Sequence, residues 1–325
     1  MISLETLITI FIFITGACIG SFLNVVALRG LSGESIVFPP SKCPKCGNKL
    51  NWYTNIPIIS YCFLRGKCRF CKKPISIQYP VVEFLNAALY LICFLTFGYT
   101  VKTLFLLPLV SLFIVIAITD LKETVVFDMH TYIIMALGVI YSLVPETDIS
   151  ILQSILGIAA GFLIFEGLAR LGYIFAGTRA FGEGDTLIAM GAGAFFGWKT
   201  LILIIFLSVL LQAFLTLPLL FNKSLKNKDY KTTSAYLILV LAVIAVYLFK
   251  KFNLYDNFPL ILGLLITVSI MLLLALCIIL KDIRQKRSSD DFLYLPFGPA
   301  LVFAGLIAIF YQTQLTEFAK TLLNL

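Results

Sequence analysis

The chain has 325 residues, of which 60% are hydrophobic and 13% are charged, and its formal net charge is +8. This composition excludes an ordinary soluble globular protein, because apolar runs on this scale need lipid around them. It contains neither a P-loop motif nor a strand-linked G-x-G-x-x-G, so the sequence shows no nucleotide-binding motif that could drive transport. We expect membrane lipids as its surroundings and no nucleic-acid partner.

The first apolar run covers residues 4–27 and predicts a transmembrane helix. It is long enough to span, and no basic residue precedes it, which disfavours a cleaved signal peptide. Hydropathy predicts nine more spans, at 80–97, 102–119, 130–144, 151–176, 184–197, 199–221, 234–249, 258–280 and 293–311. The predicted fold is therefore an all-α integral membrane protein, a polytopic bundle of about ten transmembrane helices. The spans 130–144 and 184–197 are shorter than the ~20 residues of a perpendicular span, and we expect them to be tilted or to form half-helices.

The segment between Arg29 and Tyr79 fixes the predicted orientation. It holds nine of the 25 Lys and Arg residues and a single acid, Glu34, whereas the rest of the chain carries sixteen charges of each sign. The positive-inside rule places this loop in the cytoplasm. Counting spans then puts the amino terminus outside, and the loops around Asp120 and around residues 182–185 inside.

The same loop contains two C-x-x-C pairs, Cys43 with Cys46 and Cys68 with Cys71, separated by 21 residues. Two such pairs complete a tetrahedral site of four thiolates, so we expect a closed, structural zinc site. Zinc would stabilise a loop with little apolar core by about 10 kcal/mol or more. Two disulfides or free thiols are the alternatives, and a reducing cytoplasm disfavours the disulfides.

The other chemically active side chains form no comparable motif. Cys18, Cys62, Cys93 and Cys277 are expected to be ordinary buried thiols. His130 is the single histidine, it has no G-x-S-x-G motif to serve, and we expect it to cap a helix or pack.

Two aspartates lie where apolar segments meet the predicted cytoplasmic side. Asp120 closes one apolar run, and Asp185 opens another within the sequence FGEGD. Two carboxylates at one depth can share a proton, which leaves one acid and one base to activate water. Gly182 and Gly184 would let an extended substrate approach the backbone closely.

Simpler interpretations compete with this one. Asp185 can be a helix cap, and Asp120 can be a solvated residue at the interface. Asp128, Glu83, Glu166 and Glu183 are further acids for the same role. Among these, we expect Glu166 to pair with Arg170 one turn later, and Asp128 to cap the helix that follows it.

The ordered motifs resemble the type IV prepilin peptidases, bacterial leader peptidases with N-methyltransferase activity that belong to the G-x-G-D aspartyl proteases. The likeness runs in order through most of the chain: GSFLNVVALR (20–29), CPKC, NIPIISY (55–61), LRGKCRFC (64–71), ISIQYPVVEFL (75–85), the Asp of ITDLKETVVFD, GEGD, GAFFGW (193–198) and LPFGPAL (295–301).

The resemblance implies that Asp120 and Asp185 are the catalytic pair, supported by Gly182 and Gly184, and that Cys43, Cys46, Cys68 and Cys71 bind zinc. It also implies cleavage of the basic leader of prepilin or pseudopilin substrates on the cytoplasmic side. Methylation of the new amino terminus with S-adenosylmethionine would follow, at a site that the resemblance does not locate. The expected location is the bacterial inner membrane, in a type IV pilus or type II secretion system. The oligomeric state stays open.

The chain departs from the family pattern at three places. Leu187 stands where a Lys is common, Phe127 replaces a Pro, and residues 222–291 form a longer segment than expected. The missing Lys weakens the expectation of substrate contacts near Asp185. We expect three domains: the first helix (1–27), a Cys₄ zinc-binding domain (28–79) and a membrane-embedded protease domain (80–325). A peptidase without methyltransferase activity, and a non-enzymatic membrane scaffold or transporter, are the alternative functions.

Overall fold

The computed structural model describes residues 3–145, 147–177, 179, 181–226 and 296–323. Apart from two isolated β-bridges, the regular secondary structure of these residues is helical. Five of the helices are long and apolar enough to cross a membrane: α1 (Leu4–Ser32), α3 (Gln78–Phe97), α4 (Val101–Glu123), α6 (Ile151–Ala176) and α7 (Glu183–Lys226). The all-helical prediction is confirmed for this part of the chain. The total of ten stays a prediction, and the expected spans 234–249 and 258–280 lie outside the described residues.

Helix α1 is longer than its apolar run predicts, because it ends at Ser32 and not at residue 27. Gly33 caps it in the left-handed conformation, with φ 69°, and its N–H donates to the carbonyl oxygens of Arg29 and Gly30. Hydropathy reports where lipid ends, whereas the capping glycine decides where the hydrogen-bond ladder ends.

Two of the later predicted boundaries are also changed. The spans 184–197 and 199–221 are joined in α7, which breaks at Gly197 (φ 74°, ψ 164°), so the sequence had located the break between them. Helix α10 (Gly298–Leu323) begins five residues later than predicted, with Pro299 in its first turn, where a missing N–H costs nothing. It continues past residue 311, after a break at Tyr311 (φ −118°).

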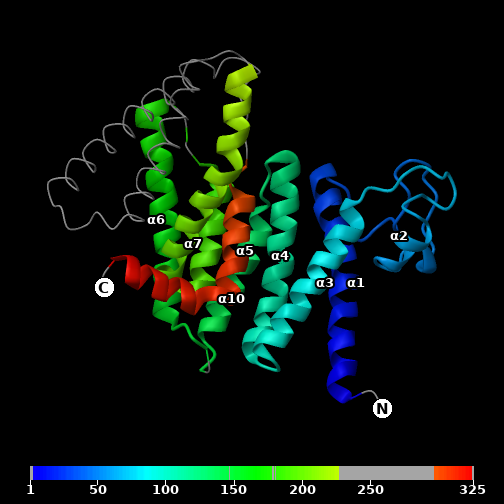
Figure 1. The fold of residues 1–325 in the computed structure, drawn as a ribbon, viewed down its shortest axis with the longest axis horizontal. Helices are drawn as coiled ribbons and strands as arrows, with labels where there is room; N and C mark the ends of the chain where they lie inside the picture. The colour runs from blue at the N-terminus through cyan, green and yellow to red at the C-terminus, as the bar shows by residue number, and fades with distance from the viewer. Residues whose placement is uncertain (1–2, 146, 178, 180, 227–295, 324–325) are drawn as a thin grey trace, which may run out of the picture. The chain divides into compact units, whose positions relative to one another are not determined.

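Helix α4 contacts more of the described helices than its neighbours α1 and α3 do. It packs against α1, α3, α10 and the short helix α5 (Asp128–Ser142), and Figure 1 shows it between α3 and α5. A buried polar chain joins α1, α3 and α4: Asn86 donates to the Gly16 carbonyl oxygen at 2.7 Å, Ser111 donates to Asn86 at 3.0 Å, and Tyr90 lies 3.0 Å from Ser111. These groups satisfy one another where no water reaches them.

Small residues let the remaining helices approach closely. A side chain at Gly157 of α6 would collide with the backbone of Gly193 in α7, and a side chain at Gly138 of α5 would meet Ala194 at 2.6 Å. The Ser154 hydroxyl donates to the Ala194 carbonyl oxygen at 2.7 Å. Such small-residue contacts are typical of helices that pack in lipid, where apolar side chains gain little from leaving their surroundings.

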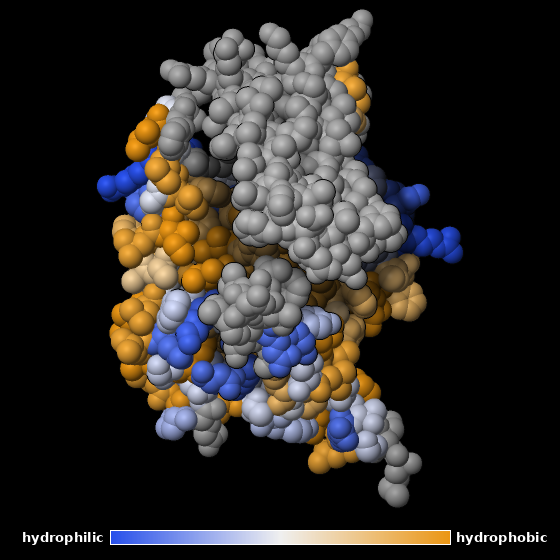
Figure 2. All heavy atoms as spheres, turned by 60° about the vertical axis from the view of Figure 1, so that its left-hand side comes forward, coloured by the Kyte–Doolittle hydropathy of each residue, from blue (hydrophilic) through white to orange (hydrophobic). Residues whose placement is uncertain are grey.

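The outer surfaces are apolar. Leu152 and Leu163 of α6 are exposed, as are Phe11 of α1 and Phe84 of α3. Figure 2 shows orange, hydrophobic side chains over much of the coloured surface on the face it presents. Exposed side chains of this kind on long helices are those that lipid would cover.

The chain divides into two compact units. The first comprises residues 1–165, 183–208 and 296–325 and holds the cysteine loop, the polar chain and the close contacts described above. The second comprises residues 166–182 and 209–295. The expected domain boundaries after residues 27 and 79 stay predictions.

The contact between α6 and α7 predicts a strong size limit at Gly157. Replacing Gly157 with Val should destabilise the purified protein by about 1–3 kcal/mol, because overpacking forces the two backbones apart. Gly167 is the matched control, since a Cβ there meets nothing within 4 Å. Thermal unfolding in detergent measures both, and a Gly157→Val protein with the melting temperature of Gly167→Val would contradict the packing.

Candidate active site and Cys₄ cluster

Asp120 lies in the last turn of α4 and is only 5% exposed. The backbone N–H of Gly298, at the start of α10, donates to its carboxylate, while its Oδ2 atom has no hydrogen-bond partner among the residues that the structure describes. A buried carboxylate oxygen without a donor is costly in a purely structural residue. Asp120 is therefore not the solvated interfacial residue of the simpler interpretation.

Asp185 lies in the first turn of α7 and is 6% exposed. Gly298 links this turn to Asp120: a Cβ built on Gly298 would collide with Asp120 Oδ2 and would lie 3.1 Å from Ile188, one turn after Asp185. The end of α4, the start of α7 and the start of α10 therefore meet around one glycine. The structure brings the surroundings of both aspartates together, as their predicted common depth requires, and their catalytic role stays a prediction.

Gly184 serves a packing need that the sequence did not reveal. A Cβ at this position would lie 2.7 Å from Cβ of Val126, which precedes α5. The side chain of Val126 thus lies against the Gly184 backbone, where we had expected a substrate. Glu183, in the variable position of the motif, is exposed.

Gly182 follows a segment that is hydrogen-bonded to the second half of α6. Arg179 donates to Glu166 at 2.6 Å and, through Nε, to the carbonyl oxygen of Phe181 at 3.0 Å. Arg170 also donates to Glu166, at 3.2 Å, which confirms the predicted pair. Glu166 is therefore engaged in ion pairs, and Arg179 is a partner that sequence spacing did not indicate.

The start of α5 differs from its prediction. Asp128 is the first helical residue and exposed, and Phe127 occupies the cap position without a side-chain hydrogen bond, so the expected Asp128 cap is wrong. Phe127, which replaces the family's Pro, lies against Gly30 of α1, where a Cβ would be 3.1 Å from its ring. The rings of His130 and Phe127 lie edge to face, with their centroids 5.7 Å apart, so His130 packs as expected.

The four cysteines of the loop form a cluster in which every Sγ atom lies within 4.8 Å of the others. They stand on two knuckles of the same shape. Cys43 donates its N–H to the Asn48 carbonyl oxygen and accepts from Gly47, while Cys68 donates to Lys73 and accepts from Lys72. Gly47 (φ 72°) and Lys72 (φ 57°) occupy the same left-handed position of each knuckle.

The cluster fits a tetrahedral metal. Zinc bonds of about 2.3 Å place thiolates about 3.8 Å apart, which these sulfurs can reach with small movements. The backbone N–H groups of Cys71 and Phe70 lower the pKa of Cys68 to about 6, because they donate to its sulfur and favour the thiolate. All four ligands are sulfur, so a bound zinc would be closed to substrate.

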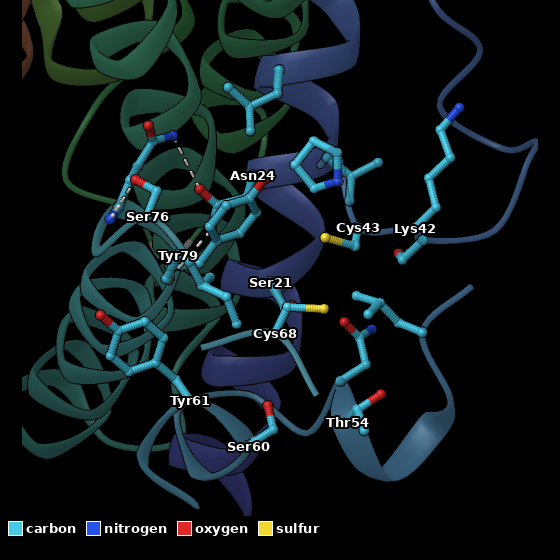
Figure 3. Close-up of a pocket in the computed structure, with 18 of the residues that line it drawn as sticks. Ser21, Asn24, Lys42, Cys43, Thr54, Ser60, Tyr61, Cys68, Ser76 and Tyr79 are labelled. Atoms are coloured by element: carbon cyan, nitrogen blue, oxygen red, sulfur yellow. Dashed lines mark hydrogen bonds between the residues drawn. The ribbon is translucent and has the colours of Figure 1, made fainter. Parts of the chain in front are cut away.

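A cavity of about 890 Å³ lies between the cluster and the parts of α1 and α3 that adjoin the Cys₄ loop. Figure 3 shows Cys43 and Cys68 on one side of it and Asn24, Ser76 and Tyr79 on the other. Its wall also includes Lys122 of α4, two residues after Asp120, although Asp120 itself does not line it.

Glu83 of α3 borders this cavity and has a role that sequence reasoning missed. It is buried, and its Oε2 accepts a hydrogen bond from the backbone N–H of Ile58 at 2.7 Å. The sequence raised it only as a competing catalytic acid. The sequence does show a carboxylate within an apolar run. It gives no sign that the partner of this carboxylate is the backbone N–H of Ile58, 25 residues earlier in the loop.

The expectation for the remaining cysteines is only partly right. Cys93 is buried, whereas Cys18 and Cys62 are exposed. Both exposed thiols belong to segments whose neighbouring residues form an apolar surface, which hydropathy alone cannot distinguish from a core. Cys277 lies outside the described residues.

Comparisons with known proteins agree with these features. Residues 14–97 match the bacterial peptidase A24 N-terminal domain, and residues 107–217 match the type IV leader peptidase family. A prepilin leader peptidase/N-methyltransferase of Myxococcus xanthus is 38% identical over 60% of this chain and 58% of its own length. Proteins of the same name from Klebsiella pneumoniae (32% identical; 59% of this chain, 86% of theirs) and Aeromonas hydrophila (30%; 64% and 80%) are also similar. No solved structure matches.

The fold and the site define a class: helical membrane proteins that carry a Cys₄ loop and two buried aspartates at helix ends. The chain belongs to the type IV leader peptidase family, as the resemblance indicated. It is a multi-pass protein of the bacterial inner membrane.

The cluster predicts about one zinc ion per chain. Replacing Cys43 and Cys68 together with Ser should abolish zinc binding, because it removes one thiolate from each knuckle. Elemental analysis of the purified protein measures the metal, and limited proteolysis should then cut the loop first. Cys62→Ser is the control and should keep its zinc. A double variant with full zinc content would refute the site.

Proposed function

We propose that this protein is a membrane aspartic endopeptidase that removes the short basic leader of prepilin or pseudopilin substrates on the cytoplasmic side and then methylates the new amino terminus. The observation that carries the peptidase is Asp120, a buried carboxylate beside the first turn of α7, one oxygen of which has no partner within the described part of the chain. The names of the relatives support both activities.

In the proposed cleavage, Asp120 and Asp185 share one proton. The ionised carboxylate takes a proton from water, whose oxygen attacks the scissile carbonyl carbon, while the protonated carboxyl donates to the carbonyl oxygen. Collapse of the tetrahedral intermediate breaks the C–N bond, and the leaving amine takes up a proton. The N–H of Gly298 holds the Asp120 carboxylate in place through this sequence.

The Cys₄ cluster holds the loop in its fold and takes no part in cleavage. Zinc is its best-fitting occupant, because four thiolates on two knuckles suit a tetrahedral ion. The loop in turn forms one wall of the cavity.

The cavity is the proposed place of the methyl donor. Its volume of about 890 Å³ is within the range of small-molecule pockets, about 300–1,000 Å³. Arg29 and Lys73 offer charges for a carboxylate, and Tyr79 offers a ring surface for a base. S-adenosylmethionine would supply an electrophilic methyl group there, and these side chains would bind and orient it.

Asn at either aspartate should abolish cleavage. Asp120→Asn, Asp185→Asn and the double variant should each lose on the order of 10³-fold in rate, without additivity, because the pair works as one unit. Mass spectrometry of a co-expressed prepilin measures leader removal and methylation together. Stability should change little, since Asn keeps the size of Asp and relieves repulsion between like charges.

Asp128→Asn and Glu183→Gln are the controls and should stay active, because both residues are exposed at the edge of the site. A folded Asp185→Asn protein that still cuts prepilin would end the dyad hypothesis.

Filling the cavity should separate the two activities. Val25 lines the cavity from α1, and Val25→Trp should raise the KM for S-adenosylmethionine at least about tenfold by occupying its space. Cleavage should stay within about twofold, since Asp120 of α4 and Asp185 of α7 do not line this cavity. Ile14→Trp, on an exposed position of the same helix, is the matched control. Unchanged methylation by Val25→Trp would remove the methyl donor from this cavity.

A further inference from the structure

The segment from Leu50 to Leu64 has the composition of a membrane-binding loop. It contains no charged residue, although Lys49 and Arg65 border it directly and the loop around it is strongly basic. It carries Trp52 and Tyr53, residue types that favour the interface between lipid and water. Its carboxyl-terminal part forms the short helix α2 (Ile59–Phe63).

Helix α2 has two faces. Ser60, Tyr61 and the following Leu64 line the cavity, whereas Ile59 and Phe63 are 52% and 85% exposed and Cys62 is exposed as well. The polar face is thus used within the protein, and the apolar face has no cover from the described residues. An exposed Phe and Ile beside each other are unfavourable in water.

The position of α2 along the bundle gives its depth. Ile58 is bonded to Glu83 of α3, and Glu83 lies against Gly20 of α1, where a Cβ would be 2.8 Å from the Glu83 Cα atom. Gly20 precedes Arg29, the first basic residue of α1, by about 14 Å of helix. Figure 1 accordingly shows α2 beside the half of α1 that leads to Ser32 and not beyond its end. The turn before α2 therefore lies at the level of the apolar part of α1.

The backbone of this turn is suited to a place without water. Ile58 has φ 61° and ψ −53°, and the Ile59 N–H donates to the Pro57 carbonyl oxygen at 2.5 Å, which defines a strained γ-turn. The N–H groups of Ser60 and Cys62 donate to the carbonyl oxygens of Ile56 and Ile58. Glu83 takes up the Ile58 N–H, which a strained turn in lipid could not leave unpaired.

We propose that the apolar face of α2, formed by Ile59, Cys62 and Phe63, inserts into the cytoplasmic leaflet of the membrane, and that Glu83 holds it there. The neighbouring helices also expose large apolar side chains, Phe22 of α1 and Phe84 of α3. The basic residues on both sides of the segment complement the anionic head groups above it. The Cys₄ loop is thus anchored in lipid through its middle.

Tryptophan quenching in nanodiscs of phosphatidylethanolamine and phosphatidylglycerol tests this insertion. The chain has two tryptophans, Trp52 and Trp198, so Trp52→Phe with Trp198→Phe gives a full-length background for single probes. Phe63→Trp should be quenched several-fold more by dibrominated lipids than Lys49→Trp, and acrylamide should show the reverse order. Equal quenching of both probes by acrylamide would overturn the proposal. So would a Phe63→Trp probe shielded from both quenchers, which would indicate a protein partner on this face.

Glu83 is tested in the same background. Glu83→Ala should reduce the lipid quenching of Phe63→Trp, because the Ile58 N–H loses its acceptor, whereas Glu83→Gln keeps an acceptor oxygen and should retain it. Zinc content in both variants reports whether the loop is still folded. Retained quenching in a zinc-replete Glu83→Ala protein would show that Glu83 does not hold the segment.

Discussion

A carboxylate that is buried within a membrane protein needs hydrogen-bond donors from the protein, and this constraint applies to three carboxylates of the fold. Glu83 meets it with a loop amide, and so ties the Cys₄ loop to α3. Asp120 meets it in part, through the N–H of Gly298, and one of its oxygens finds no partner in residues 3–226 and 296–323 as far as these are described. Asp185 is buried in the first turn of α7, where the positive end of the helix dipole favours a negative charge. Glu83, whose carboxylate accepts a loop N–H, thus stabilises the fold, whereas Asp120 keeps a carboxylate oxygen that a substrate or water can use.

Donors can reach these carboxylates because glycine keeps backbones close. A side chain at Gly298 would occupy the space of Asp120 Oδ2, and one at Gly20 would displace α3 at Glu83. Gly184 admits Val126 in the same way and fixes the loop before α5 against the start of α7. Packing within the protein therefore accounts for Gly20, Gly184 and Gly298.

The sequence could predict what depends on local pattern. Apolar runs gave the long helices, the C-x-x-C spacing gave the sulfur cluster, and the i, i+4 spacing gave the pair of Glu166 with Arg170. It could not predict partners that tertiary structure supplies, such as Ile58 for Glu83 or Gly298 for Asp120. The exposed Cys18 was misjudged for a related reason, because the hydropathy of an apolar run does not tell which side chains face the protein core and which face outward.

Helix α4 relates the two proposed activities to each other. Asp120 faces the start of α7 and α10, whereas Lys122 lines the cavity beside the Cys₄ loop. Two residues on a helix differ in direction by about 200°, so these side chains serve different faces at nearly one depth. In the proposed scheme, a newly cut amino terminus therefore has to leave the dyad and pass around the end of α4 before it can be methylated. Anchoring the loop in lipid through α2 would keep the cavity at this depth during the transfer.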